Sequence, residues 1–162
     1  AKVDELKATI LKPMELYEEK KGLTTDPDIN PEYILPKQFM FRLQKIMDEY
    51  AGGVSANFTT NESMLNRAME LLGWLSEDSN KLGAATLHDL MRSWENIQRM
   101  WQAEAHVRTI LAREETRWPG YYFRADKPKI DEENWLKFVN CKWDPASGEW
   151  SIIDRKIHRI FE

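Results

Sequence analysis

The chain has 162 residues, which suits one domain of ordinary size with a real hydrophobic core. Its formal net charge of -4 argues against a nucleic-acid-binding protein, because nucleic acid requires a basic face. No apolar run approaches the roughly 18 residues of a membrane span, and charged first residues argue against a secretory signal, so we expect a cytoplasmic protein with no membrane span.

The first predicted helix covers residues 2–21. Its apolar side chains recur on one face: Val3, Leu6, Ile10 and Leu11. Pro13 should kink or restart this helix, since an interior proline removes a hydrogen bond. Neither an initiator methionine nor a capping residue precedes the pattern, so we interpret the sequence as cut from something larger. A proline-rich connector follows, up to residue 35.

Three further helices are predicted over residues 36–52, 60–82 and 86–115, joined by short links. Pro36 suits a first helical position, and Gly52 with Gly53 suits a helix end. Thr59 and Glu62 form a capping box for the next helix. Short links favour antiparallel neighbours. The predicted fold class is therefore mainly α: an up-down-up three-helix bundle with an extra N-terminal helix and a C-terminal tail.

The helix over residues 86–115 carries two apolar rows. The first predicts the buried face, with Trp94 and Trp101 in the core, and consists of Leu87, Leu90, Met91, Trp94, Ile97 and Trp101. A second row begins at Met100 and continues with Ala103, Val107 and Ile110, so the C-terminal half is apolar on more than one side. Apolar residues on more than one side indicate a central helix.

The tail should contain a short β-hairpin. Residues 138–143 and 150–153 are strand-like, and the turn-forming segment Asp144–Glu149 lies between them. An isolated two-stranded ribbon is only marginally stable in water, so the hairpin must pack on the bundle or on a neighbouring protein. The predicted division is 1–35 for the N-terminal helix and connector, 36–118 for the bundle, and 119–162 for the aromatic turn and hairpin tail.

The turn after the long helix is the candidate interface. Arginine beside aromatic side chains is typical of the buried cores of protein interfaces. In the isolated chain we expect this cluster to be exposed or covered by a copy of itself in a homodimer. One alternative is a solvated helix end with local ion pairs, and another is a tail that folds back over the cluster. The candidate residues are Arg113, Glu114, Arg117, Trp118, Tyr121, Tyr122, Arg124 and Asp126.

No motif in the chain carries chemistry. The glycine patterns that cradle phosphates are absent, so we expect no cofactor-binding residue and a chain that is colourless when purified alone. Cys141 has no CxxC partner and the three histidines are scattered, so we expect no metal ligand. Glu114 and Glu115 are adjacent and would point apart on a helix, so no catalytic residue is predicted.

Several segments resemble the C-terminal region of dissimilatory adenylylsulfate reductase alpha subunits, and together they span almost the whole chain. They are Pro36–Lys37, Arg42–Tyr50, Trp94–Asn96, Trp101–Arg108, Arg113–Asp126, Asp131–Trp135, Phe138–Asn140 and Gly148–Trp150. More distantly, Arg113–Glu114, Thr116–Arg117 and Arg124–Asp126 are similar to the C-terminal helical domain of succinate dehydrogenase and fumarate reductase flavoproteins.

The resemblance implies part of an oxidoreductase that converts adenylylsulfate to sulfite and AMP. It implies FAD in the parent subunit and iron-sulfur clusters in a beta subunit that supplies electrons. The implied partners are an upstream flavin domain of the same subunit and that beta subunit. In this family the flavin fold lies mainly upstream of the matched region, so we expect a structural and subunit-packing role and an inactive chain in isolation. A free-standing helical interaction module is the alternative from another class.

Overall fold

The structure, a computed structural model, describes residues 2–23, 30–117 and 122–158. Its α-helices are α1 (Lys2–Lys20), α2 (Pro36–Tyr50), α3 (Glu62–Asp78), α4 (Leu87–Ala112) and α5 (Glu132–Trp135). Short 3-10 helices are η1 (Lys21–Leu23), η2 (Val54–Ala56) and η3 (Ser79–Lys81). The strands are β1 (Thr59–Thr60), β2 (Phe123–Arg124), β3 (Lys137–Asp144) and β4 (Glu149–Lys156). The predicted mainly helical class with a C-terminal hairpin is confirmed.

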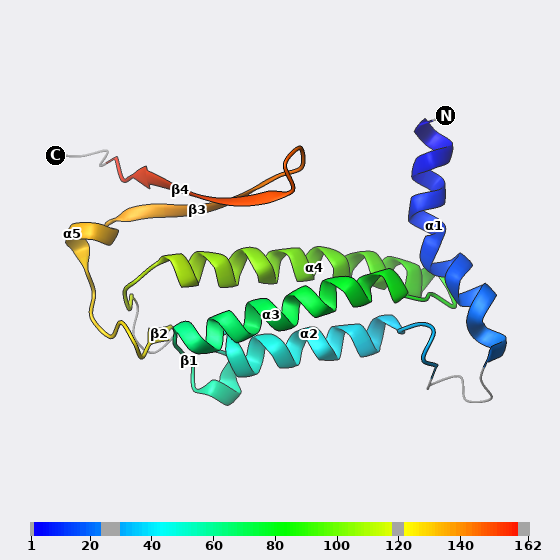
Figure 1. The fold of residues 1–162 in the computed structure, drawn as a ribbon, viewed down its shortest axis with the longest axis horizontal. Coiled ribbons are helices and arrows are strands. Elements are labelled where there is room, and N and C mark those ends of the chain that lie inside the picture. Colours follow the sequence, from blue (N-terminus) through cyan, green and yellow to red (C-terminus); the bar gives the residue numbers. More distant parts are fainter. Residues whose placement is uncertain (1, 24–29, 118–121, 159–162) are drawn as a thin grey trace. The chain divides into compact units, whose positions relative to one another are not determined.

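The chain forms two compact units. Unit 1 contains Ala1–Lys45 and Leu72–Trp101, and unit 2 contains Ile46–Leu71 and Gln102–Glu162. The helices α2, α3 and α4 each contribute to both units, and within each unit their segments lie side by side with alternating directions (Figure 1). The division into three parts along the chain stays a prediction.

The core of unit 1 forms where α1 and the connector meet the long helices. The Tyr17 and Tyr33 rings pack edge to face with centroids 5.2 Å apart. Tyr33 fits closely over Gly83, where a side-chain carbon would approach the ring to 3.1 Å. α1 continues through Pro13, whose carbonyl accepts the Ala84 amide at 2.9 Å. Other buried apolar residues here are Ile34, Phe39, Leu43, Leu72, Leu75, Leu82, Ala84, Leu90 and Met100.

The buried face of α4 differs from the predicted one. Trp101 is 53% exposed, so its assignment to the core was wrong, and Trp94 is only half-buried, with its indole N–H donating to the Ile10 carbonyl at 3.1 Å. The buried row is Leu90, Ser93, Asn96, Met100, Ala103, Val107 and Ile110. Two polar residues interrupt this row, which is why its apolar pattern was not recognised over the whole helix.

The two buried polar residues of α4 have hydrogen-bond partners that make their burial tolerable. The Ser93 hydroxyl donates to the Asp89 carbonyl at 2.9 Å. The Asn96 amide donates to the Pro36 carbonyl at 2.7 Å, which ties α4 to the start of α2. Burying a polar group costs little only when such a partner exists.

The cap of α3 was also assigned to the wrong residue. Asn61, not Thr59, accepts a hydrogen bond from the first turn, with its side-chain oxygen 2.9 Å from the Met64 amide. Thr59 and Thr60 instead form β1, which pairs in parallel with β2 in unit 2. The end of α2 agrees with prediction, because the helix stops at Tyr50 and Gly52 adopts a positive φ of 79°.

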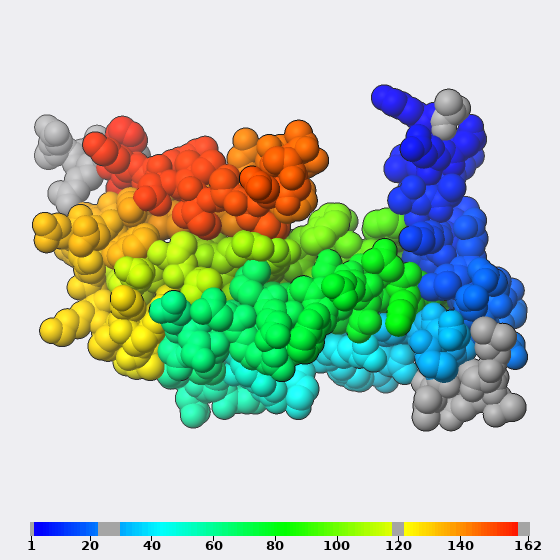
Figure 2. Space-filling model, in the orientation of Figure 1, coloured from blue at the N-terminus to red at the C-terminus, as the bar shows by residue number. Residues whose placement is uncertain are grey.

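The predicted hairpin is confirmed and is longer than expected. β3 and β4 are antiparallel, with Trp143 opposite Trp150 and their rings 5.2 Å apart. Gly148 takes a positive φ of 71° in the turn. Arg108 of α4 lies 5.8 Å from the Trp150 ring, so the hairpin contacts α4 within unit 2. On the face shown in Figure 2, the orange and red atoms of the hairpin are not covered by other parts of the chain.

The first half of α1 exposes its apolar stripe. Its large uncovered side chains are Val3, Leu6, Ile10 and Leu11. Over the part of the chain that the structure describes, none of the helices is both long and apolar enough to cross a membrane.

Candidate functional site

The candidate interface belongs to unit 2 and begins where α4 ends. The prediction extended this helix to residue 115, but it stops at Ala112. The Arg124 guanidinium binds two carbonyl groups at the end of this helix. Its Nη1 donates to Ile110 O at 2.8 Å and to Arg113 O at 3.1 Å. A cation at a helix C-terminus also interacts favourably with the helix dipole. Arg124 is therefore the C-terminal cap of α4.

Arg124 also pairs with Asp126 in a bidentate ion pair. Nε lies 2.9 Å from Oδ1 and Nη2 lies 2.6 Å from Oδ2, while Arg124 is only 1% exposed. The hydrogen bonds from Arg124 lower the pKa of Asp126 to about 2. Oδ2 also accepts the Glu62 amide at 3.2 Å, at the N-terminus of α3. This ion pair thus joins the end of α4 to the start of α3.

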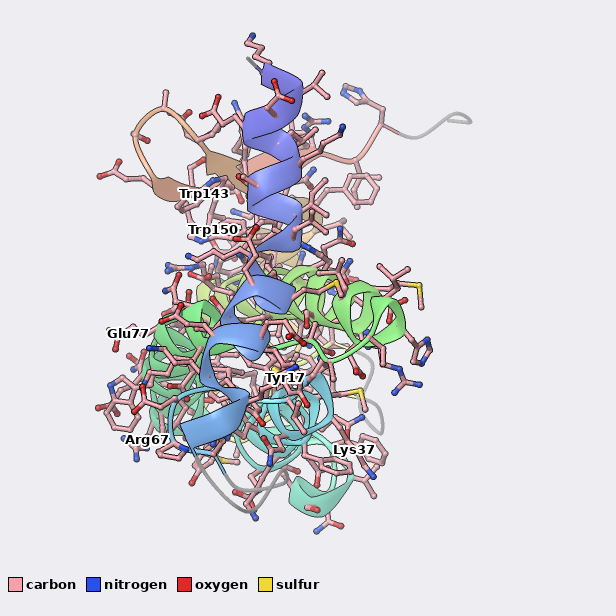
Figure 3. All side chains as sticks on the ribbon, turned by 90° about the vertical axis from the view of Figure 1, so that its right-hand side faces the viewer. Tyr17, Lys37, Arg67, Glu77, Trp143 and Trp150 are labelled. Carbon is pink, nitrogen blue, oxygen red and sulfur yellow. The ribbon has the colours of Figure 1, made fainter. Side chains whose placement is uncertain are left out.

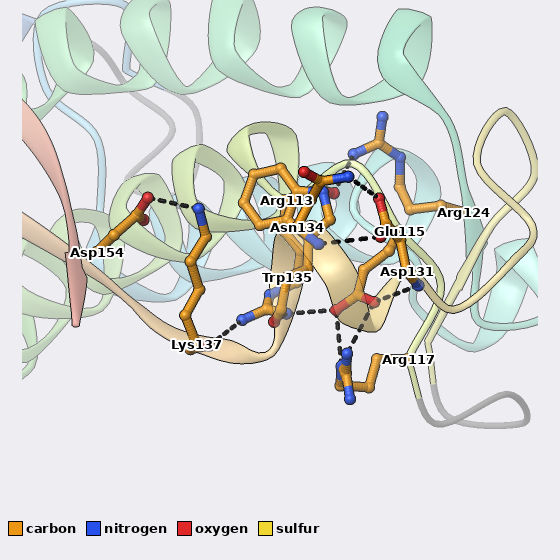
Figure 4. A network of polar contacts seen from close by, with 9 residues as sticks. All are labelled: Arg113, Glu115, Arg117, Arg124, Asp131, Asn134, Trp135, Lys137 and Asp154. Atoms are coloured by element: carbon orange, nitrogen blue, oxygen red, sulfur yellow. Dashed lines mark hydrogen bonds and ion pairs between the residues drawn. The ribbon is translucent and has the colours of Figure 1, made fainter. Parts of the chain in front are cut away.

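Glu115 is the centre of a second ion cluster and is fully buried, with 0% of its surface exposed. Arg117 binds its carboxylate with two hydrogen bonds of 2.7 and 2.9 Å, and Arg113 donates to the same group. The Asp131 amide adds a hydrogen bond of 2.9 Å. Figure 4 shows these donors converging on Glu115. Burial alone would raise the pKa of Glu115, but its hydrogen bonds outweigh burial and hold the pKa below the ordinary value.

Arg113 connects the end of α4 to the hairpin tail. Its Nη1 donates to Trp135 O at 3.0 Å and its Nη2 to Lys137 O at 2.8 Å. The guanidinium also lies 5.7 Å from the Trp135 ring, and Lys137 Nζ lies 4.5 Å from it. Lys137 in turn pairs with Asp154 at 2.6 Å, as Figure 4 shows. Arg113 is therefore held by α5 and β3 of the same chain.

The remaining candidate residues are divided between exposed, half-buried and undescribed positions. Glu114 has a 60% exposed side chain and a long contact of 3.7 Å to Lys127. The Tyr122 hydroxyl is buried without a hydrogen-bond partner among the described residues, and burial raises its pKa to about 12. Trp118 and Tyr121 lie outside the described residues. The structure therefore binds Arg113 and Arg117 to the Glu115 carboxylate, and it pairs Arg124 with Asp126.

Three residues of this region were missed as parts of the site. Glu115 was considered only as one of two adjacent carboxylates, and Thr116 and Asp131 were named only within the segments that carry the resemblance. Thr116 is buried, and its hydroxyl accepts the Arg124 amide at 2.9 Å and donates to Lys127 O at 2.8 Å. The sequence offered a signal only for Glu115: if the segment after the helix is extended, residues 113, 115 and 117 point to one side.

The chemistry of this region is that of a fixed scaffold. Glu115 and Asp126 both have lowered pKa values and are bound by arginine, so neither is suited to carry a proton near neutral pH. Across the described ranges, the histidines, cysteine and acidic residues form no group of three that could hold a metal ion.

Comparisons with known proteins find a matching family model and similar chains of known structure. The family model described as fumarate reductase flavoprotein C-term matches residues 41–159. The chain is 46% identical over 157 residues to adenylylsulfate reductase subunit alpha of Megalodesulfovibrio gigas, which covers 97% of this chain and 24% of that protein. The solved adenylylsulfate reductase of the hyperthermophile Archaeoglobus fulgidus matches with 52% identity and a TM-score of 0.95, over 99% of this chain and 25% of that chain.

A more distant match shows the fold alone. The Sdh1 complex of Mycobacterium smegmatis in its apo form is 18% identical, with a TM-score of 0.70, over 99% of this chain and 25% of that chain. In each of these comparisons the chain spans only about a quarter of the length of the relative.

Proposed function

The chain belongs to the family of fumarate reductase flavoprotein C-terminal domains, and from this premise we propose that it forms the C-terminal helical domain of an adenylylsulfate reductase alpha subunit. The observation that carries the proposal is the 46% identity over 97% of the chain to such a subunit. The alternative, a domain of a succinate dehydrogenase or fumarate reductase, is supported by the family model and by the fold, but the sequence identity to the solved Sdh1 complex falls to 18%. A free-standing helical module would not account for this identity.

The proposed whole enzyme converts adenylylsulfate to sulfite and AMP. FAD would bind in the part of the subunit outside these 162 residues, and an iron-sulfur beta subunit would supply electrons. This chain would hold the subunit together, without touching the reacting atoms. Its described polar clusters support that role, because Arg113 and Arg124 each bind several backbone carbonyls of the same chain. We place the enzyme in the cytoplasm.

The reaction is tested on the purified natural subunit with its partner. AMP and sulfite together should bleach the absorbance of the oxidised flavin, because forming adenylylsulfate from them releases two electrons. Adenylylsulfate should then restore the absorbance of the flavin by accepting two electrons. Bleaching by succinate, with no response to AMP and sulfite, would favour the alternative family. A natural protein with no flavin at all would contradict both assignments.

We also propose that the outer side of the turn packs on the flavin-binding part of the subunit or on the beta subunit. The side chains of Arg124 and Arg113 are 1% and 18% exposed, whereas Arg117, although bound to Glu115, keeps 25% exposed and Glu114 keeps 60%. A guanidinium beside aromatic residues gains most when a partner removes its water. A homodimer of this chain is the other partner that we retain for this surface.

Arg117→Ala tests this interface. It should weaken assembly by roughly 2 kcal/mol if Arg117 is a hot spot. Assembly with the partner subunit and the unfolding free energy of the chain should be measured together. Unchanged assembly with a destabilised chain would mean that Arg117 acts only through Glu115, as internal scaffolding.

A further inference from the structure

A pocket in unit 1 lies between the first turns of α2 and the first half of α4. It has a volume of about 330 Å³, and its lining includes Lys37, Met91 and Arg92. Lys37 projects outward from α2 in Figure 3. The pocket is distinct from the turn described above, because all its lining residues belong to unit 1.

The pocket carries positive charge that the described residues do not neutralise. Arg99 is compensated, since its Nη2 lies 3.3 Å from the Glu95 carboxylate. Arg92 donates instead to the His88 ring at 2.8 Å, and Lys37 lies 5.7 Å from the centre of the Phe41 ring. Within the described part of the chain, neither cation has a carboxylate at ion-pair distance. An acidic group would therefore complete this site.

Exposed apolar side chains lie at this pocket. Phe41, whose ring lies beside Lys37, is 54% exposed, and Met91, which lines the pocket, is 52% exposed; Leu87, one turn before Met91, is 71% exposed. Leu87 and Met91 are four residues apart on α4 and so share one face. Exposed apolar side chains that lie together beside charged groups mark an interaction site. Methionine, aromatic and arginine residues are also enriched in interface cores.

We infer that this pocket receives an acidic, partly apolar segment of the same subunit, from the part of the subunit outside these 162 residues. The inference rests on the proposed function, because that function supplies the remaining chain. About three quarters of the Archaeoglobus fulgidus chain lies outside the region that matches ours. A segment on the same polypeptide reaches the pocket at high effective concentration, so it occupies the pocket ahead of a separate protein of similar affinity.

The charge of the pocket is tested on the whole subunit with its partner bound. The rate of Lys37 acylation by an amine reagent is followed by peptide mass spectrometry, in wild type and in Arg92→Glu. The variant should react about tenfold faster or more, since a like charge repels the acidic segment and uncovers Lys37. The direct effect of a new carboxylate has the opposite sign, because it favours the protonated, unreactive amine.

Arg42→Glu is the matched control for this experiment. Arg42 is also on α2 in unit 1 and is 52% exposed, but it pairs with Asp78 and does not line the pocket. This variant should leave the Lys37 rate unchanged. No increase in Arg92→Glu, or an equal increase in both variants, would overturn the inference.

The occupant is identified by carbodiimide cross-linking of the same complex, which joins a lysine directly to a carboxylate. Lys37 should be joined to an acidic residue of its own subunit outside these 162 residues. A link to the partner subunit or to a second copy would overturn the inference, as would protection of Lys37 by inorganic phosphate without any cross-link. Failure of the proposed function is recognised separately. It would appear as a flavin that does not respond to AMP and sulfite, or as a natural protein whose mass equals that of these 162 residues.

Discussion

Single buried charges hold the C-terminal part of this chain together. Glu115 and Arg124 are almost completely buried, and each is matched by several partners. Glu115 receives hydrogen bonds from two arginines and one amide, and Arg124 donates to Asp126 and to two helix-end carbonyls. An uncompensated buried charge is costly, so removing one member should have a larger effect than its own contacts suggest.

Glu115→Gln should lower the unfolding free energy by about 3 kcal/mol. The substitution keeps the shape of the side chain but removes the charge that Arg113 and Arg117 share. Glu114→Gln is the matched control: its side chain is 60% exposed, and we expect a change within about 0.5 kcal/mol. Urea unfolding at neutral pH measures both. Equal effects in the two variants would mean that burial of Glu115 is unimportant.

Asp126 should make the stability depend on acid. Its folded pKa of about 2 lies below the ordinary 3.8, so its contribution is complete above pH 3.8 and is lost as pH falls through 2. Because Asp126 is partly exposed, we expect about 1–2 kcal/mol from this group. The unfolding free energies of wild type and Asp126→Asn should therefore differ at about pH 6. They should converge towards about pH 2, because Asp126 becomes protonated there. A constant difference would show that Asp126 acts through its shape alone.

At the scale of elements, α4 is the helix on which both units depend. Its buried row continues from Leu90 to Ile110 through Ser93 and Asn96, and it supplies core residues to unit 1 and to unit 2. The large apolar residues beside this row remain exposed, among them Leu87, Met91 and Trp101. α4 therefore has a buried face set by packing and a second apolar face that is open for contact.

Neighbouring positions on α4 separate these two faces. Met100 is 2% exposed and Trp101 is 53% exposed. Met100→Ala should cost about 2–5 kcal/mol, because it leaves a cavity in the core. Trp101→Ala should cost less than about 1 kcal/mol in the isolated chain, despite the larger side chain. Thermal or urea unfolding of both variants measures these costs. A greater loss of unfolding free energy in Trp101→Ala than in Met100→Ala would contradict the buried row of α4.

At the scale of the whole molecule, this chain matches only part of much longer relatives. It spans about a quarter of the relatives it matches, and it keeps many large apolar side chains exposed on α1, α2 and α4. Such surfaces are expected where a domain packs on other parts of its own protein. The chemistry of the proposed enzyme would then depend on groups that this chain positions but does not contain.

The isolated 162-residue chain should be colourless after gel filtration, whereas the whole natural subunit should carry flavin. The reason is the lack of a glycine-rich loop at a helix N-terminus, which would hold the flavin phosphates. Absorbance spectra of both preparations at equal protein concentration provide the measurement. Stoichiometric flavin retained by the isolated chain would refute this expectation.

The elements that rely on local signals could be predicted from the sequence. Helical periodicity located α2, α3 and α4, the turn chemistry of Asp144–Glu149 located the hairpin, and Gly52 marked the end of α2. These signals act between residues that are close in the chain, so they are present before any packing. The resemblance that identified the family is likewise a property of the sequence.

Tertiary structure alone decided which face of α4 is buried and where the charges of the turn lead. Asn96 belongs to the core only because the Pro36 carbonyl, 60 positions away, accepts its amide. Glu115 is buried only because Arg117 and the distant Asp131 amide satisfy it, and Arg124 caps α4 from beyond the turn. Periodicity counts polar residues as exposed, whereas burial depends on whether a partner from another element cancels the cost of losing water.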